Sequence, residues 1–132
     1  MIKREADFPG GRHLILVVED NRDNMRLTCD LLEAYGFRVD RADNPTEARR
    51  AISMRRPDLI LMDISLQGMD GLTLTRILKK EPLTRDIPIV ALTAHALKQD
   101  EVNAYAAGCD GFITKPINTR LFPRQIIKFL RQ

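Results

Sequence analysis

The stretch Leu14-Ile15-Leu16-Val17-Val18-Glu19-Asp20 is an unbroken apolar run that ends in two carboxylates. Two further runs of the same kind, residues 59–62 and 89–92, lie later in the chain. Continuously apolar runs rich in branched side chains are typical of strands buried on both faces of a parallel sheet. The first run is the longest, with five residues. A membrane-spanning helix needs about 20, so none is expected.

Segments with helical spacing separate these runs, as Met25, Cys29 and Leu32 illustrate. The expected strands are residues 13–18, 37–40, 58–62, 87–92 and 111–114, and the expected helices lie around residues 25–32, 48–57, 72–82, 96–107 and 121–130. This alternation predicts an α/β fold in a single domain: a doubly wound, five-stranded parallel sheet of flavodoxin-like type, with helices on both faces. The strand order stays open. The polar residues 1–12 are expected to form a flexible leader ahead of a domain that spans 13–132.

Charge and cysteine content exclude several classes of protein. Lys and Arg total 21 against 18 Asp and Glu, and this small excess is spread along the chain, which argues against nucleic acid or a membrane as partner. The first residues lack the apolar core of a secretory signal. Cys29 and Cys109 are too few for a disulfide framework or a zinc site. We therefore expect a cytoplasmic protein, with Cys29 packed inside and Cys109 partly exposed.

Polar side chains directly follow four of the expected strands: Glu19 and Asp20, Asp63, Thr93, and Lys115. Singly, each is explained as well by a helix cap or a solvated side chain. Open α/β sheets, however, bind ligands at the carboxyl ends of their strands. Two carboxylates about 4 Å apart repel by roughly 4 kcal/mol at an effective dielectric constant of 20, so three of them together predict a cation. Lys115 supplies part of that charge, and the oxygen donors suit Mg²⁺.

A site of carboxylates, Mg²⁺, a hydroxyl and a lysine suits phosphoryl transfer, in which catalysis is mostly positioning and charge stabilisation. A carboxylate can act as the nucleophile and form an aspartyl-phosphate. Asp63 is the best candidate, because it stands alone at a buried strand end and leaves Glu19 and Asp20 for the metal.

Five segments, in this order and spacing, resemble the response-regulator receiver domains of two-component signalling, the chemotaxis-regulator-like family. They read Leu-Val-Val-Glu-Asp-Asn (16–21), Pro-Asp-Leu-Ile-Leu-Met-Asp-Ile (57–64), Gly-Met-Asp-Gly (68–71), Ile-Pro-Ile-Val-Ala-Leu-Thr-Ala (87–94) and Gly-Phe-Ile-Thr-Lys-Pro (111–116). The resemblance covers residues 13 to 131. It implies that Asp63 accepts a phosphoryl group from a histidine kinase or histidine phosphotransfer protein. It also implies that Asp20 and Asp63 bind Mg²⁺ directly, together with the carbonyl of Ser65. Glu19 would bind the ion through water.

The same resemblance assigns the remaining roles. Lys115 and Thr93 would hold the phosphoryl oxygens beside the small Ala94, Thr93 and Phe112 would move together as the switch, and the Lys115–Pro116 bond would be cis. Ser65 and His95 would flank the path of attacking water and tune the lifetime of the phosphoryl group. Gln67 and Phe112 depart from the family, which commonly has proline and tyrosine there.

The resemblance thus implies a single-domain regulator that catalyses only its own phosphorylation and dephosphorylation and signals by binding a downstream protein. It would act as a monomer or as a phosphorylation-dependent dimer. The partner surface would include Tyr105, Arg120 and Arg124, although a solvated basic helix face explains the arginines more simply.

Three alternatives fit the residues less well. A haloacid-dehalogenase-like phosphatase needs an acidic residue two positions after the nucleophile, where this chain has Ser65. A flavin-binding module needs a first loop that cradles phosphate, and Glu19 and Asp20 would repel it; no glycine-rich dinucleotide motif is present there either. An interaction domain that no longer needs phosphate would not require Asp63, Thr93 and Lys115.

Overall fold

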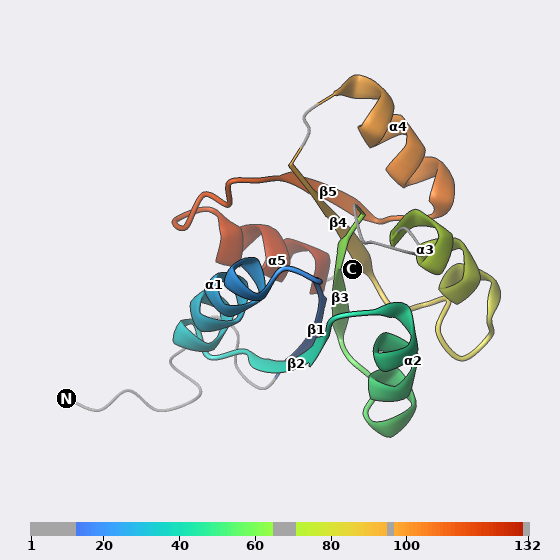
Figure 1. Ribbon diagram of the computed structural model, residues 1–132, viewed down its shortest axis with the longest axis horizontal. Helices are drawn as coiled ribbons and strands as arrows, with labels where there is room; N and C mark the ends of the chain where they lie inside the picture. Colours follow the sequence, from blue (N-terminus) through green and yellow to red (C-terminus); the bar gives the residue numbers. More distant parts are fainter. Residues whose placement is uncertain (1–12, 65–70, 95–96, 131–132) are drawn as a thin grey trace.

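The computed structural model describes residues 13–64, 71–94 and 97–130, in which strands and helices alternate (Figure 1). The strands are β1 (Leu14–Val18), β2 (Arg38–Ala42), β3 (Leu59–Asp63), β4 (Ile89–Thr93) and β5 (Gly111–Thr114). The helices are α1 (Arg22–Ala34), α2 (Pro45–Met54), α3 (Gly71–Lys80), α4 (Lys98–Ala107) and α5 (Phe122–Leu130). The expected leader, residues 1–12, lies outside the described residues.

The five strands form one parallel sheet in the order β2-β1-β3-β4-β5. This confirms the predicted α/β fold and supplies the strand order that the sequence left open. The chain leaves β1 toward β2 on one side and later returns to β3 on the other, so the topology switches direction between β1 and β3. In sheets of this type a switch point marks the ligand crevice.

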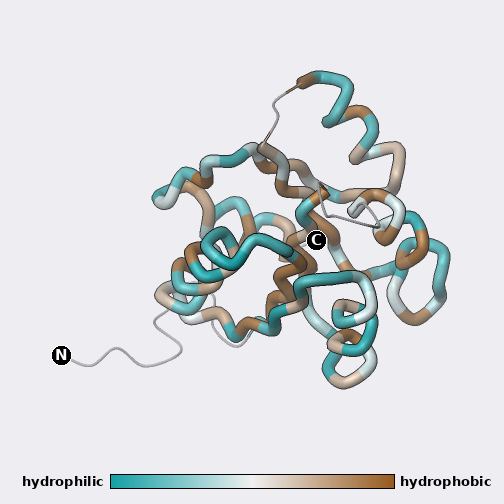
Figure 2. The backbone as a smooth tube through the Cα atoms, viewed as in Figure 1, coloured by the Kyte–Doolittle hydropathy of each residue, from teal (hydrophilic) through white to brown (hydrophobic). Residues whose placement is uncertain are grey.

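Alternate side chains of the strands enter two separate cores. Ile15 and Val17 of β1 pack with α1 and α5, whereas Leu16 and Val18 pack on the other face with residues of α2, α3 and α4. Strands β1, β3 and β4 are buried throughout, and Figure 2 shows hydrophobic stretches concentrated in the middle of the molecule. The edge strand β2 is the most exposed of the five, with two exposed and two half-buried residues, which explains its weaker apolar pattern.

Local signals fix where the helices start and end. The Asn21 side chain accepts a hydrogen bond from the backbone N–H of Asn24 at 2.9 Å and caps α1 immediately after Asp20. The Asn44 side chain caps α2 in the same way, with Pro45 at the first helical position. Gly108 ends α4 with a φ of +109°, a conformation that glycine adopts without strain.

The structure corrects two of the expectations. Cys109 is buried, with 5% exposure, because the turn at Gly108 folds it into the core beneath α3 and α4. Arg120 precedes α5, which begins only at Phe122. Cys29 packs inside as expected. No helix within the described residues is long and apolar enough to cross a membrane.

Candidate functional site

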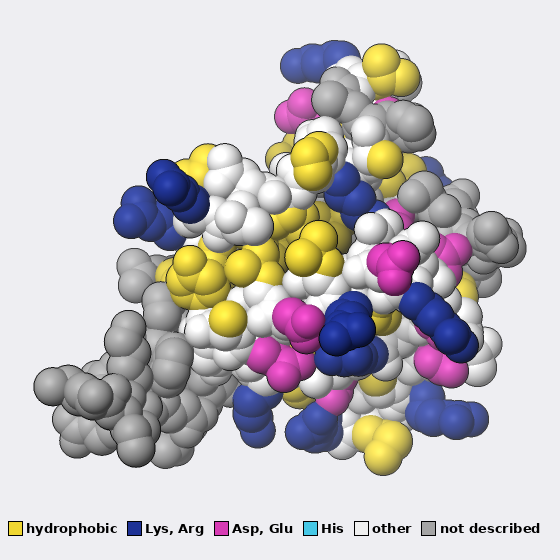
Figure 3. Space-filling view, turned by 60° about the vertical axis from the view of Figure 1, so that its left-hand side comes forward, with side chains coloured by type: hydrophobic (Ala, Val, Ile, Leu, Met, Phe, Trp, Pro, Cys, Tyr) yellow, Lys and Arg dark blue, Asp and Glu magenta, His cyan; other side chains and the backbone are white. Residues whose placement is uncertain are grey.

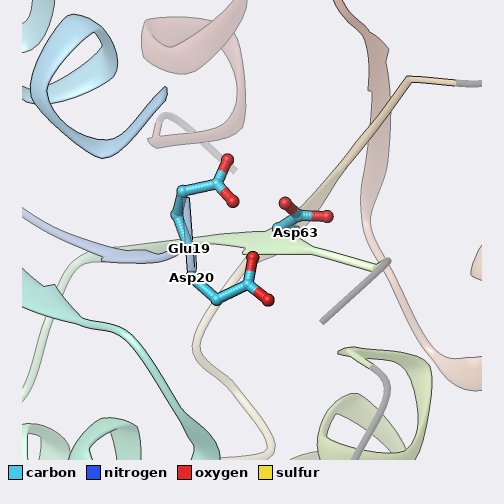
Figure 4. Close-up of side chains that lie close together, drawn as sticks. All are labelled: Glu19, Asp20 and Asp63. Carbon is cyan, nitrogen blue, oxygen red and sulfur yellow. The ribbon is translucent and has the colours of Figure 1, made fainter. Parts of the chain in front are cut away.

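Three carboxylates meet where β1 and β3 end. Glu19 and Asp20 follow β1, and Asp63 is the last residue of β3; the two strands are paired up to Val18 and Met62. One oxygen from each carboxylate lies within 4.8 Å of the others, and Figure 4 shows the three side chains facing one common space. Glu19 and Asp63 are almost fully buried, with 1% and 3% exposure, whereas Asp20 is exposed.

Lys115 brings a positive charge to the same place from β5. Its Nζ donates hydrogen bonds to Glu19 Oε1 at 2.7 Å and to Asp63 Oδ2 at 3.1 Å. The backbone N–H of Lys115 donates to the carbonyl of Thr93 at 2.7 Å, which extends the pairing of β4 with β5 by one residue. The Lys115–Pro116 peptide bond is cis, as the resemblance implied.

The electrostatics of the cluster leave negative charge in excess. Burial raises the pKa of Glu19 to about 7, and the neighbouring Asp63 adds to this rise while Lys115 opposes it. Burial alone lowers the pKa of Lys115, but its hydrogen bonds to Glu19 and Asp63 outweigh burial and raise it above its ordinary value. Lys115 is therefore charged at neutral pH, and one ammonium faces three carboxylates. The donor set fits a hard divalent cation such as Mg²⁺.

The remaining predicted site residues fall into two groups. Thr93 ends β4 next to Leu92, the partner of Asp63 in the sheet, and is buried; Ala94 follows it at the surface. Phe112 of β5 is half-buried against the core beneath α2, α3 and α4. Ser65 and His95 lie outside the described residues, so their predicted roles are not tested.

Two clefts open beside the cluster, one on each side of α1. The first, about 490 Å³, is lined by Glu19 and Asp20 together with arginines of α1 and β2. The second, about 460 Å³, is lined by Lys115 and Ala94 together with Leu27 and other residues of α1. The cluster is thus reached from two directions.

Sequence reasoning gave no structural role to Gly71, the first residue of α3. A Cβ atom at this position would lie 2.3 Å from the carbonyl oxygen of Asp63 and 2.8 Å from the Cα of Ile64. Only glycine lets the start of α3 approach the backbone of Asp63 so closely. Two signals in the sequence pointed to it: a glycine at the start of an expected helix, and its place at the end of the Gly-Met-Asp-Gly segment that resembles the family.

Comparisons with known proteins agree with this geometry. A family model described as the response regulator receiver domain matches residues 15–127. The chain belongs to the response-regulator receiver family. The polar-differentiation response regulator DivK of Brucella anthropi is 43% identical to this receiver over 116 residues, which are 88% of this chain and 94% of that protein.

Solved structures show the same relationship. The receiver domain of the sensor histidine kinase PA1611 from Pseudomonas aeruginosa, with a magnesium ion coordinated in its active-site cleft, superposes with a TM-score of 0.83 at 33% identity, covering 91% of this receiver and 98% of that chain. A two-component response regulator from Clostridium difficile has a TM-score of 0.83 at 31% identity and covers 91% and 97%.

Membership of this family defines the general activity. The protein is a response regulator of a two-component system, and receivers act as phosphoacceptor switches that take phosphoryl groups from histidine kinases and bind downstream targets. Receivers bind Mg²⁺ at an acidic pocket, and the cluster of Glu19, Asp20 and Asp63 supplies suitable donors.

Proposed function

We propose that Asp63 is the phosphoacceptor, that a histidine kinase or histidine phosphotransfer protein is the donor, and that the reaction depends on Mg²⁺. One observation carries the proposal. The buried carboxylate of Asp63 contacts the ammonium of Lys115 at 3.1 Å and shares one space with Glu19 and Asp20. A carboxylate in that setting is held in place and is flanked by positive charge for a phosphoryl group.

In the reaction, a carboxylate oxygen of Asp63 attacks phosphorus and forms a new P–O bond. The P–N bond to the donor imidazole breaks, its electron pair stays on that nitrogen, and the nitrogen takes a proton. Lys115, already hydrogen-bonded to Asp63, holds the phosphoryl oxygens as their charge develops. Asp20 and Asp63, with the carbonyl of Ser65, would hold Mg²⁺ directly and Glu19 would hold it through water. When bound there, Mg²⁺ would supply positive charge that offsets the charge on the transferred oxygens.

We place the donor at the cleft on the Lys115 side of α1. The donor imidazole must reach Asp63, and Lys115 both touches Asp63 and lines this cleft. Leu27 on its rim is 60% exposed, and Figure 3 shows hydrophobic side chains gathered on this face of the molecule. A large exposed apolar patch beside a reactive group suits a protein donor.

We infer that the downstream surface is formed by α4, β5 and α5. Tyr105 on α4 is 48% exposed, and Arg120 and Arg124 are exposed near the start of α5. Thr93 and Phe112 lie on the two strands that lead to this surface. A phosphoryl group on Asp63 that draws Thr93 toward it would change how Phe112 and this surface are packed, and so shift the population of two conformations. The occupant is a partner protein or a second phosphorylated copy.

We infer that the receiver acts in the cytoplasm. Cys29 and Cys109 are free and buried, which agrees with a cytoplasmic protein. Apart from its own phosphorylation and dephosphorylation, we assign the receiver no catalytic activity.

Intact mass after incubation with acetyl phosphate and Mg²⁺ tests the proposal. We expect one added phosphate, which needs Mg²⁺ and is lost in Asp63→Asn. Asp86→Asn, an exposed carboxylate beyond α3, is the matched control and should be labelled like the wild type. A label that survives Asp63→Asn or forms equally with EDTA contradicts the assignment. Size-exclusion chromatography of the phosphorylated chain separates a monomer from a dimer.

A further inference from the structure

A third cleft lies between the C-terminal ends of α2 and α3, at the edge of the sheet where the strands begin and thus opposite to Asp63. It measures about 360 Å³. Ile52 of α2, Leu78 of α3 and Leu83 just after α3 supply its apolar lining. Arg49, Arg56 and Glu81 supply its charged rim. We call this feature the α2–α3 groove.

The apolar side chains of this region are unusually exposed. Leu83 is 83% exposed and Met54, the last residue of α2, is 76% exposed; they are the two most exposed large apolar side chains among the described residues. Leu78, by contrast, is buried and lines the base of the α2–α3 groove. Single exposed apolar residues need no explanation, but a hollow with an apolar lining and protruding apolar neighbours is typical of a docking surface.

The rim carries a local excess of positive charge that the modest net charge of the chain hides. Arg49, Arg50, Arg55 and Arg56 fall within eight residues that contain no acidic side chain. Arg55 pairs with Asp40 and Arg49 with Glu81, so Arg50 and Arg56 are the members of this group that no carboxylate of the described residues neutralises. The C-terminal half of α2 is therefore cationic, whereas the three carboxylates lie where β1 and β3 end.

The bonds that these arginines make are easily exchanged. Arg49 reaches across the groove to Glu81 at 2.8 Å, and Arg56 donates to the backbone carbonyl of Leu83. Both arginines are exposed, and ion pairs between exposed side chains contribute little to stability. Arg50 forms no ion pair with any residue of 13–64, 71–94 or 97–130. A ligand carboxylate can therefore pair with this rim without unfolding anything.

We propose that the α2–α3 groove docks an acidic peptide segment of a partner protein, which places an apolar side chain between Ile52 and Leu83 and pairs its carboxylates with Arg49 and Arg56. A hollow between two helices fits one inserted side chain. Because the groove lies at the far edge of the sheet from Asp63, docking is independent of phosphorylation. The groove would hold a partner near the receiver in both states.

A synthetic acidic peptide tests this on the full chain. The probe is a helical peptide of about 15 residues with leucines on one face and glutamates on the other, followed by amide chemical shifts in ¹⁵N spectra. We expect binding with a dissociation constant below about 1 mM, with shifts centred on Ile52, Leu78 and Leu83. The same peptide with lysines in place of the glutamates should not bind. Absence of binding by the acidic peptide overturns the proposal.

Matched variants locate the site. Leu83→Asp and Arg49→Glu alter exposed side chains, so the fold is kept, and each should weaken binding by about tenfold or more. Leu121→Asp, an equally drastic change at an exposed leucine remote from the groove, should leave binding unchanged. Equal affinity in Leu83→Asp and wild type overturns the proposal.

Other occupants give distinct results. Flotation with vesicles of phosphatidylglycerol and phosphatidylcholine that depends on Leu83, without peptide binding, would assign the groove to a membrane. Sedimentation that shows a dimer lost in Leu83→Asp would assign it to a second copy. Residues 1–12 include Glu5, Asp7 and Phe8; tighter peptide binding in Phe8→Ser would assign it to this chain's own segment. Each of these outcomes overturns the partner-peptide assignment.

Phosphorylation separates this inference from the proposed function. Peptide affinity should agree within about twofold with and without acetyl phosphate and Mg²⁺, and also in Asp63→Asn. A larger change would refute the independence of the two sites, whereas a failure of Asp63 to be phosphorylated leaves the peptide result intact.

Discussion

Replacing Gly71 with alanine places a methyl group where the structure leaves no room. The added Cβ would lie 2.3 Å from the carbonyl oxygen of Asp63, whereas ordinary contacts begin at 3.4 Å, so α3 or the end of β3 must move by roughly 1.1 Å. The atoms it meets are backbone atoms, which cannot rotate away. In the absence of a clash, alanine would stabilise a helix position by up to about 1 kcal/mol relative to glycine. Overpacking costs about 1–3 kcal/mol, so after the gain in helix propensity we expect a net loss of up to about 2 kcal/mol.

The same displacement should slow phosphorylation, because it moves the backbone that carries the nucleophile. A misplacement of about 1 Å at a reacting group costs about 100-fold in rate. Urea unfolding measures the stability, and the rate of mass increase with acetyl phosphate and Mg²⁺ measures the reaction.

Gly111→Ala is the matched control. Its Cβ would lie 2.2 Å from the ring of Phe129, at the start of β5 and away from Asp63. This variant should lose stability but keep its phosphorylation rate within about twofold. A Gly71→Ala protein that is at least as stable as wild type and is phosphorylated at the same rate would refute the reasoning.

Four further results are expected. Lys115→Met removes the ammonium that faces Glu19 and Asp63, so the phosphorylation rate with acetyl phosphate should fall by about 100-fold or more. The pKa of Glu19 is raised from 4.5 to about 7 in the folded chain, so burial of its carboxyl costs no stability below pH 4.5, where the carboxyl is neutral in both the folded and the unfolded chain. Without Mg²⁺, the free energy of unfolding should fall by at most about 3 kcal/mol as the pH rises from 4.5 to 7. Urea titrations of Glu19→Gln should not show this fall. Mg²⁺ at 100 times its dissociation constant should raise the free energy of unfolding at pH 7.5 by about 2.7 kcal/mol, and Asp20→Asn should shift that dependence to higher Mg²⁺ concentrations. Exchanging Ser65 and His95 together should change the dephosphorylation rate by more than about twofold, as followed by loss of the added mass; an unchanged rate would rule out their tuning role.

The strands of the sheet could be predicted from the sequence because parallel strands that are buried on both faces appear as continuous apolar runs. The run 14–18 coincides with β1, and the runs 59–62 and 89–92 coincide with β3 and β4 to within one residue. The order β2-β1-β3-β4-β5 was not predictable, because it depends on the side to which each crossover returns. The side to which each crossover returns is decided by the packing of the helices on the sheet.

The cluster of site residues was predictable for a geometric reason. The carboxyl ends of parallel strands share one edge, so Glu19 and Asp63, which end or follow the neighbouring strands β1 and β3, lie together. Lys115 follows β5, and its long side chain spans the width of β4 to reach both carboxylates. The close approach of Gly71 to Asp63 and the burial of Cys109 were not predictable, because both depend on how a helix packs in three dimensions. The concentration of arginines at residues 49–56 was visible in the sequence, but the hollow beside it was not.

Helix α1 separates the two clefts that open beside the carboxylate cluster. Asp20 is the exposed carboxylate and lines the cleft on one side of the helix, while Lys115 lines the cleft on the other. A cation would thus reach the carboxylates from bulk water through the cleft that Asp20 lines, on the other side of α1 from the cleft proposed for the protein donor. If the donor occupies the cleft on the Lys115 side, as proposed above, the metal and the donor would not compete for one route, and the ion could exchange while the donor is bound.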